Sequence, residues 1–226
     1  MTKNKLNIKI FRDIEQRTDA WMQIKSGKTS GSGVKPILSA RTPAPWKTYA
    51  YKLISQRENE ALATYRDGYL SEAVQWGQDM EPEAIKEFEK RTGKIVEQVG
   101  WVESLDPALK GKSGCSPDGI ITIKEWVEIK CLSTENHIKF VTENSLPTDF
   151  KPQVINYFVI NPDLDVVYLA LYDPRVKIVK KKLHIIPVFR KDCQKDIDAL
   201  SANMLKFHDL TDELHQQFLS TPDYNE

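Results

Sequence analysis

The sequence has few cysteines, and they form neither a disulfide framework nor a zinc-binding pattern. Its 226 residues include three, Cys115, Cys131 and Cys193. Disulfide-rich secreted domains carry an even number of cysteines in a short chain, and structural zinc sites use closely spaced pairs. The odd number and wide spacing exclude both, as well as a four-cysteine iron–sulfur cluster. They indicate reduced thiols, as expected for a cytoplasmic protein.

Long apolar runs and an overall charge are also absent. No stretch approaches the roughly 20 apolar residues that cross a bilayer, and residues 1–13 lack the apolar block of a signal peptide. The net charge is zero, but residues 1–50 hold ten Lys and Arg against three acidic residues, and residues 171–195 hold eight against two. Two basic segments around an acidic middle suit a protein that faces a polyanion, although solvated lysine-rich loops produce the same pattern.

An ATP-binding loop is missing as well. Residues 26–35, SGKTSGSGVK, are rich in glycine and serine but lack the spacing G-x-x-x-x-G-K-[ST]. We expect a basic loop here. Its backbone N–H groups and hydroxyls suit a phosphate cradle, and a surface loop without a ligand explains the composition equally well.

The remaining pattern predicts one α/β (α+β) domain, a mixed central sheet flanked by helices. Residues 1–47 read as a basic arm with the glycine–serine loop, 48–191 as the core, and 192–226 as a C-terminal helix. Pro82 interrupts the second helix, so we expect a kink there or a new helix starting near Glu81. His208 and His215, seven residues apart, are expected on the helix surface or at a contact with a partner. The predicted helices are 48–64, 71–93, 135–143, 151–159 and 196–219, and the predicted strands are 95–103, 113–123, 126–131, 166–172 and 182–189.

Residues 114–131, GCSPDGIITIKEWVEIKC, carry the most chemical information. A turn at Pro117–Gly119, two short strands and a reversal at Lys124–Glu125 predict a hairpin that brings Asp118 beside Glu128. Side chains alternate along a strand, so Glu128 and Lys130 share one face. Two adjacent carboxylates repel each other unless a cation lies between them, and Mg²⁺ prefers such oxygen ligands. The alternative is that P-D-G is an ordinary turn and that E-x-K lies on a solvated strand face, which accounts for the same sequence pattern without a metal site.

Together with segments further along the chain, this pattern resembles a known family. The segments are Asp19–Ala20–Trp21, Trp76–Gly77 with Glu81, Lys151–Pro152–Gln153–Val154, and Tyr172–Asp173–Pro174–Arg175. They are similar to phage-lambda-type (YqaJ-like) alkaline exonucleases of the PD-(D/E)xK nuclease superfamily. The resemblance runs from about residue 19 to 175 and implies a restriction-endonuclease-like core, with residues 48–191 as its catalytic part.

The resemblance also implies a set of catalytic residues. Glu81, Asp118, Glu128 and the backbone carbonyl of Ile129 would hold one or two Mg²⁺ ions, for which Mn²⁺ can substitute. Lys130 would orient or deprotonate the attacking water, or offset charge on the phosphate; the sequence leaves these roles open. Gln153 would position the water or the lysine, and a helix-surface glutamine is the alternative.

A pocket for the DNA 5′-phosphate is implied at Lys25, Ser32 and Ser116. Lys25 stands where the lambda-type pocket has an arginine, so it would bind phosphate as a point charge without a bidentate fork. Val74 matches an apolar residue that separates the strands, whereas its spacing alone suggests a buried core valine.

The expected activity is Mg²⁺-dependent 5′→3′ digestion of double-stranded DNA ends, which releases mononucleotides and leaves 3′ single strands for a single-strand annealing protein. The implied assembly is a homotrimeric ring in the cytosol of a bacterium or a phage-infected host, without a membrane partner. A PD-(D/E)xK endonuclease of restriction or junction-resolving type and an inactive module that binds DNA ends are the alternatives.

Overall fold

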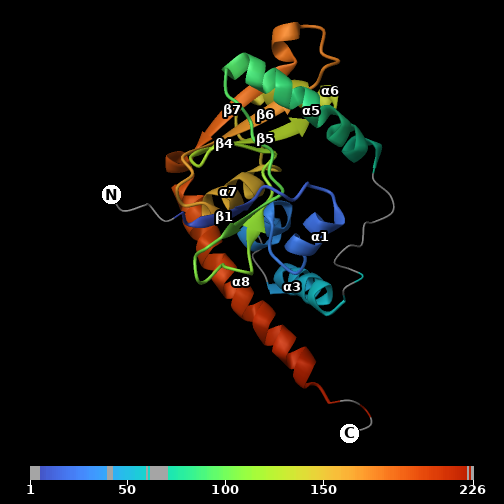
Figure 1. Ribbon diagram of the computed structural model, residues 1–226, viewed down its shortest axis with the longest axis vertical. Helices are drawn as coiled ribbons and strands as arrows, with labels where there is room; N and C mark the ends of the chain where they lie inside the picture. Colours follow the sequence, from blue (N-terminus) through green and yellow to red (C-terminus); the bar gives the residue numbers. More distant parts are fainter. Residues whose placement is uncertain (1–5, 40–42, 60, 62–70, 223, 225–226) are drawn as a thin grey trace.

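The computed structural model describes residues 6–39, 43–59, 61, 71–222 and 224. It contains a four-stranded and a three-stranded sheet with helices packed around them, which confirms the mixed α/β prediction (Figure 1). Within the described ranges, no helix has the length and apolar character that crossing a lipid bilayer requires.

The four-stranded sheet has the order β4-β5-β6-β7 and is mixed. Its central pair, β5 (Glu125–Cys131) and β6 (Val166–Tyr172), is parallel, whereas β4 (Gly119–Thr122) and β7 (Leu183–Phe189) lie antiparallel at the edges. The parallel pair requires a crossover, which α6 (Thr134–Glu143) and α7 (Lys151–Ile160) provide. The predicted hairpin is therefore present as β4 and β5.

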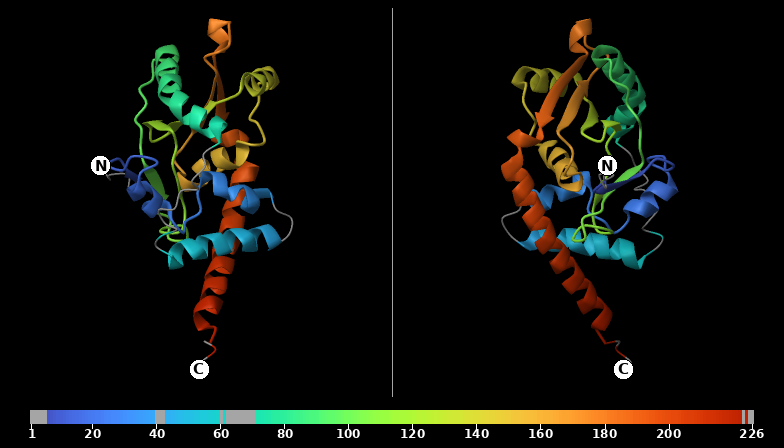
Figure 2. Two further views of the ribbon diagram at one scale, coloured as in Figure 1. Left: turned by 90° about the vertical axis from the view of Figure 1, so that its right-hand side faces the viewer. Right: turned by 60° about the vertical axis from the view of Figure 1, so that its left-hand side comes forward.

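Helices cover both faces of this sheet (Figure 2). On one face α5 (Glu72–Thr92) packs Phe88 against a small core that includes Val127 and Ile129. On the other face α6 and α7 bury Trp126 in the main core. The alternation along β5, which its sequence predicts, directs its apolar side chains into two different cores, and the second core was not predicted.

The second sheet was not predicted, because two chain segments expected to be single strands switch sheets. Residues 95–103 form a bridge from Glu97 to Ile120 of the four-stranded sheet, but form a strand only at β2 (Trp101–Ser104). Residues 113–123 similarly divide into β3 (Gly114–Cys115) and β4. Strand β2 lies between β1 (Ile8–Phe11) and β3 and pairs with both in an antiparallel sheet. Pro117 lies at the second switch and cannot donate a ladder hydrogen bond.

Helix boundaries also correct the sequence prediction. Helix α3 (Pro43–Glu58) begins five residues early, because proline is tolerated in a first helical turn; the predicted end at 64 lies outside the described residues. Helix α5 runs unbroken through Pro82 from its Ser71 N-cap to the left-handed Gly93 C-cap, so a second helix starting near Glu81 is wrong. Part of the expected glycine–serine loop is helical, as η1 (Gly31–Val34) and the start of α2 (Lys35–Ser39).

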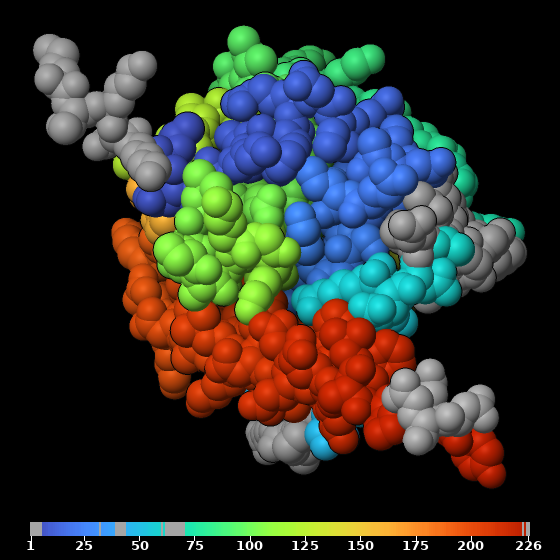
Figure 3. All heavy atoms as spheres, turned by 60° about the horizontal axis from the view of Figure 1, so that its bottom comes forward, coloured from blue at the N-terminus to red at the C-terminus, as the bar shows by residue number. Residues whose placement is uncertain are grey.

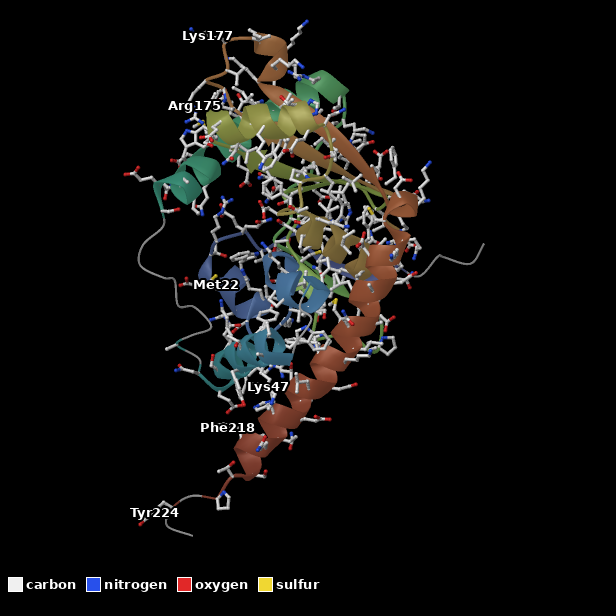
Figure 4. All side chains as sticks on the ribbon, turned by 180° about the vertical axis from the view of Figure 1, so that it is seen from behind. Met22, Lys47, Arg175, Lys177, Phe218 and Tyr224 are labelled. Carbon is white, nitrogen blue, oxygen red and sulfur yellow. The ribbon has the colours of Figure 1, made fainter. Side chains whose placement is uncertain are left out.

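The remaining elements are a short helix α1 (Asp19–Lys25), the 3₁₀ turns η2 (Val179–Lys181) and η3 (Arg190–Asp192), and α8 (Gln194–Ser220). Helix α8 lies beside α3 along one side of the body (Figure 3). Its inward stripe includes His208, which is 2% exposed and bonded to Ser113, so the predicted surface position of that residue is wrong. Phe218 lies on the part of α8 that projects beyond the body, at the opposite end from Lys177 (Figure 4).

Candidate active site

One cavity of about 390 Å³ collects residues from eight parts of the chain. These parts are the segment before α1, α1 itself, Ser30 with η1, α5, Trp101 of β2, the segment 116–118, β5 and α7. Among the predicted site residues, the cavity is lined by Lys25, Val74, Glu81, Ser116, Asp118, Glu128, Ile129, Lys130 and Gln153. The side chain of Ser32 is outside the described part of the structure; its neighbours Ser30 and Gly31 line the cavity.

The hairpin places Asp118 against β5. Asp118 precedes β4, and its Oδ2 accepts a 2.6 Å hydrogen bond from the backbone N–H of Ile129. This bond joins the two arms of the P-D-(nine residues)-E-x-K pattern across eleven positions. Asp118 is thereby held beside Glu128, the residue before Ile129.

Glu128 is 1% exposed, and all its polar partners lie within the cavity wall. Lys130 Nζ donates to Glu128 Oε1 at 2.5 Å and to Gln153 Oε1 at 3.1 Å. Gln153 Nε2 donates to Glu128 Oε1 at 2.6 Å and to the Tyr157 hydroxyl at 2.8 Å. Tyr157 in turn donates to Glu128 Oε2 at 2.5 Å. Gln153 and Tyr157 reach the same carboxylate because they are four residues apart on α7.

Glu81 approaches from α5 and forms an ion pair with Arg17. Its side chain is 13% exposed, against 42% for Arg17. Val74 lies two helical turns before Glu81 on α5. Its side chain is 47% exposed, so the interpretation of Val74 as a buried core valine is wrong. It lines the cavity near the start of α5.

The buried charges shift one another's pKa values. Burial raises the pKa of Asp118 well above its usual range, and the nearby carboxylates of Glu128 and Glu81 raise it further. Burial alone would lower the pKa of Lys130, but Glu128 and Asp118 outweigh it and raise the pKa instead.

The donor set fits a hard divalent cation, because three carboxylates and the Ile129 carbonyl are oxygen ligands. Within the described residues, no three aspartate, glutamate, histidine or cysteine side chains stand ready to hold a metal ion as they are placed here. Arg17 holds Glu81, and Tyr157 and Gln153 hold Glu128. Burial is the main cause of the raised pKa of Asp118, and the negative charge of Glu128 and Glu81, which a bound cation would neutralise, raises that pKa further.

The predicted phosphate pocket has an aromatic floor that the sequence interpretation missed. Lys25 Nζ lies 3.7 Å from the centre of the Trp21 ring. Trp21 Nε1 donates to Ser116 Oγ at 2.8 Å and to the Gly100 carbonyl at 2.9 Å. Burial, and secondarily Lys52, lowers the pKa of Lys25 to about 8. The motif Asp19–Ala20–Trp21 marks Trp21, but no sequence signal places Arg17 beside Glu81.

Comparisons with known proteins identify a family and solved structures of similar fold. The family model of the YqaJ-like viral recombinase domain matches residues 20–161. The crystal structure of an alkaline exonuclease (LHK-Exo) from Laribacter hongkongensis is 24% identical, with a TM-score of 0.71; the match covers 89% of this chain and 98% of that one. LHK-Exo in complex with dAMP is 23% identical, with the same coverage and a TM-score of 0.72.

A phage-related exonuclease from Haemophilus somnus 129PT is more distant. It is 12% identical, its match covers 84% of this chain and 96% of that one, and its TM-score is 0.54. No curated protein matches the chain.

The fold places the chain in the structural class of the alkaline exonucleases. Within that class, the chain belongs to the YqaJ-like viral recombinase domain family.

Proposed function

We propose that the protein is a Mg²⁺-dependent exonuclease that digests double-stranded DNA from its 5′ ends. It releases 5′-mononucleotides and leaves 3′ single strands for a single-strand annealing protein. The observation that carries this proposal is the convergence of Glu81, Asp118, Glu128 and Lys130 in one cavity. The complex of LHK-Exo with dAMP, a deoxynucleoside monophosphate, supports the product class.

The residues suit hydrolysis of a phosphodiester bond. Glu81, Asp118 and Glu128, with the Ile129 carbonyl, would hold one or two Mg²⁺ ions, which polarise the phosphate and activate water. Gln153 and Lys130 orient the water for attack on phosphorus, and the ammonium group of Lys130 offsets the charge that develops there. The bond to the 3′-oxygen of the terminal nucleotide then breaks, and that oxygen takes up a proton.

The preference for a 5′ end rests on the Lys25 pocket. Lys25 and Ser116 lie on the same cavity as the carboxylates, and both are polar groups that bind phosphate oxygens. A terminal phosphate held there would place the first internucleotide linkage near Glu128. Val74, half exposed on the same cavity, is suited to contact the last base pair and help open it.

The decisive experiment digests linear duplex DNA labelled separately at each 5′ and 3′ end, with Mg²⁺ and with EDTA. Closed circular DNA is the control. Early release of the 5′ label as a mononucleotide, only with Mg²⁺ and with circles intact, is expected. Nicked or linearised circles would identify an endonuclease instead. Retained end binding without cleavage would identify an inactive end-binding module.

We also propose that three copies form a ring around the duplex. The proposal rests on the resemblance to lambda-type exonucleases and on the small size of one 26.0 kDa chain, which cannot enclose DNA alone. Sedimentation equilibrium should give three times that mass. A monomer that degrades long duplexes without dissociating would refute the ring.

A further inference from the structure

Arg17 has a backbone conformation that is unusual for its residue type. Its φ is +70°, in the left-handed region that glycine adopts most readily. Asn144, the other described non-glycine residue with positive φ, caps the C-terminus of α6, which is a common place for asparagine. Arg17 caps no helix C-terminus. Residues held in such a conformation cluster at functional sites, where the surrounding structure maintains them.

The neighbours of Arg17 hold this turn firmly against the active site. Gln16 Nε2 donates to the carbonyls of Val99 and Pro117, at 2.9 and 3.0 Å, and Pro117 is the residue before Asp118. On the other side, the Thr18 hydroxyl caps α1 by accepting from the Trp21 N–H. Arg17 is therefore anchored both to the segment that precedes β4 and carries Asp118, and to the helix that carries Lys25.

The Arg17 side chain enters the cavity and pairs with Glu81. It is the one arginine among the described residues that line the cavity, beside the lysines Lys25 and Lys130. The Arg17 side chain is 42% exposed, and ion pairs with so accessible a partner contribute little to stability. Structural support for Glu81 alone therefore does not account for an arginine at a position that favours glycine.

We propose that Arg17 is a phosphate-binding residue that grips the scissile phosphate of the DNA, an inference that rests on the proposed nuclease function. Arginine presents a planar fork of N–H donors that matches two phosphate oxygens, whereas lysine offers a point charge. Arg17 is therefore the side chain that supplies bidentate recognition in a cavity whose other cations are lysines. In the absence of DNA the Arg17 guanidinium pairs with Glu81, and when DNA enters the guanidinium leaves Glu81 and binds the phosphate.

Because Arg17 lies beside Glu81, we assign it to the scissile phosphate and not to the terminal 5′-phosphate. Glu81 belongs to the carboxylate cluster where hydrolysis takes place, whereas Lys25 lies over Trp21 at the opposite end of α1. The two cations thus serve successive phosphates of one strand. Loss of Arg17 should slow cleavage of every end, while loss of Lys25 should change only the preference among ends.

Arg17→Gly is a sharp test, because it removes the guanidinium and inserts the residue that the backbone prefers. We expect kcat at saturating Mg²⁺ to fall about 10²-fold, as when one transition-state donor is lost. The thermal midpoint should be unchanged or higher, and the rate ratio between 5′-phosphorylated and 5′-hydroxyl ends unchanged. Arg17→Lys should recover only part of the rate. Arg12→Ala, which breaks an exposed ion pair with Glu97 elsewhere in the same segment, is the matched control and should retain full activity.

A binding measurement separates phosphate contact from support of Glu81. A duplex end with a neutral methylphosphonate at the first linkage should bind wild-type protein more weakly than normal DNA, in Ca²⁺ to prevent cleavage. Arg17→Gly should discriminate less between the two duplexes than wild-type protein does, because only Lys130 and Ca²⁺ still act on the charged linkage. Equal sensitivity of the two proteins to the neutral linkage, or a kcat of Arg17→Gly at saturating Mg²⁺ equal to that of wild type, would overturn the inference. A wild-type protein that cuts no DNA would instead refute the proposed function itself.

Discussion

The Tyr157 hydroxyl donates a 2.5 Å hydrogen bond to Oε2 of Glu128, a carboxylate that is 1% exposed. Burial, and then the charge of Glu128, raises the pKa of Tyr157 well above its usual range, so the hydroxyl stays a donor. Gln153 and Lys130 hold the other oxygen. Three side chains, one from β5 and two from α7, therefore hold the Glu128 carboxylate, and its orientation in the cavity depends on all three hydrogen-bond donors.

Tyr157→Phe should therefore impair both activity and stability. The variant leaves one oxygen of a buried carboxylate without its donor, which costs about 1–3 kcal/mol in the free energy of unfolding. We expect roughly a tenfold fall in kcat as Glu128 loses its orientation. Tyr172→Phe is the control, because it loses a 2.7 Å bond to Glu83 outside the cavity. Equal rates for the two variants would show that Tyr157 does not position Glu128.

Asp118→Asn should abolish cleavage without unfolding the hairpin. The amide oxygen can still accept from the Ile129 N–H, but the charge needed for a metal ligand is gone. Asp118→Ala and Lys130→Ala should be equally inactive, and all three should retain DNA-end binding. Asp165→Asn, at an exposed pair with Lys124, is the control. Wild-type digestion rates in Asp118→Asn or Lys130→Ala would contradict the site assignment.

Discrimination between 5′-phosphorylated and 5′-hydroxyl ends should depend on pH through Lys25. With a pKa lowered to about 8, Lys25 is charged below that pH and neutral above it. The preference for the phosphorylated end should therefore weaken as pH rises through about 8 and beyond.

Two substitutions at this position test the assignment. Lys25→Arg should keep its preference at high pH, because arginine stays protonated. Lys25→Ala should show little preference at any pH. A ratio that is the same in wild type and Lys25→Ala would exclude the pocket.

The buried His208 should make the protein less stable in mild acid. Burial, and secondarily Lys112, lowers its pKa from 6.5 to about 4. Because the unfolded chain binds this proton more readily, stability is complete above pH 6.5 and falls as pH drops toward 4, by roughly 3 kcal/mol in all. Urea unfolding at pH 7.5 and 4.5 measures the loss. His208→Gln can keep the bond to Ser113 without titrating and should lose less; an identical loss would assign the effect to other groups.

The sequence predicted the parts of the site that depend on local geometry. Alternation along residues 126–131 places Glu128 and Lys130 on one face and Val127 and Ile129 on the other, because the period of a strand is two. Ser71 and Gly93 marked the ends of α5 through the capping preferences of serine and glycine. The hairpin spacing likewise brought Asp118 to Glu128.

What the sequence could not determine depends on contacts between distant segments. Residues 95–103 and 113–123 read as single strands, but tertiary pairing divides them between two sheets. The sequence suggested that His208 lies on the surface of its helix. The packing of α8 against the body instead buries this residue beside Ser113. Arg17 and Glu81 lie 64 positions apart, and their pairing depends on the turn that Gln16 anchors. Local periodicity determined which residues share a face, and long-range packing decided which faces meet.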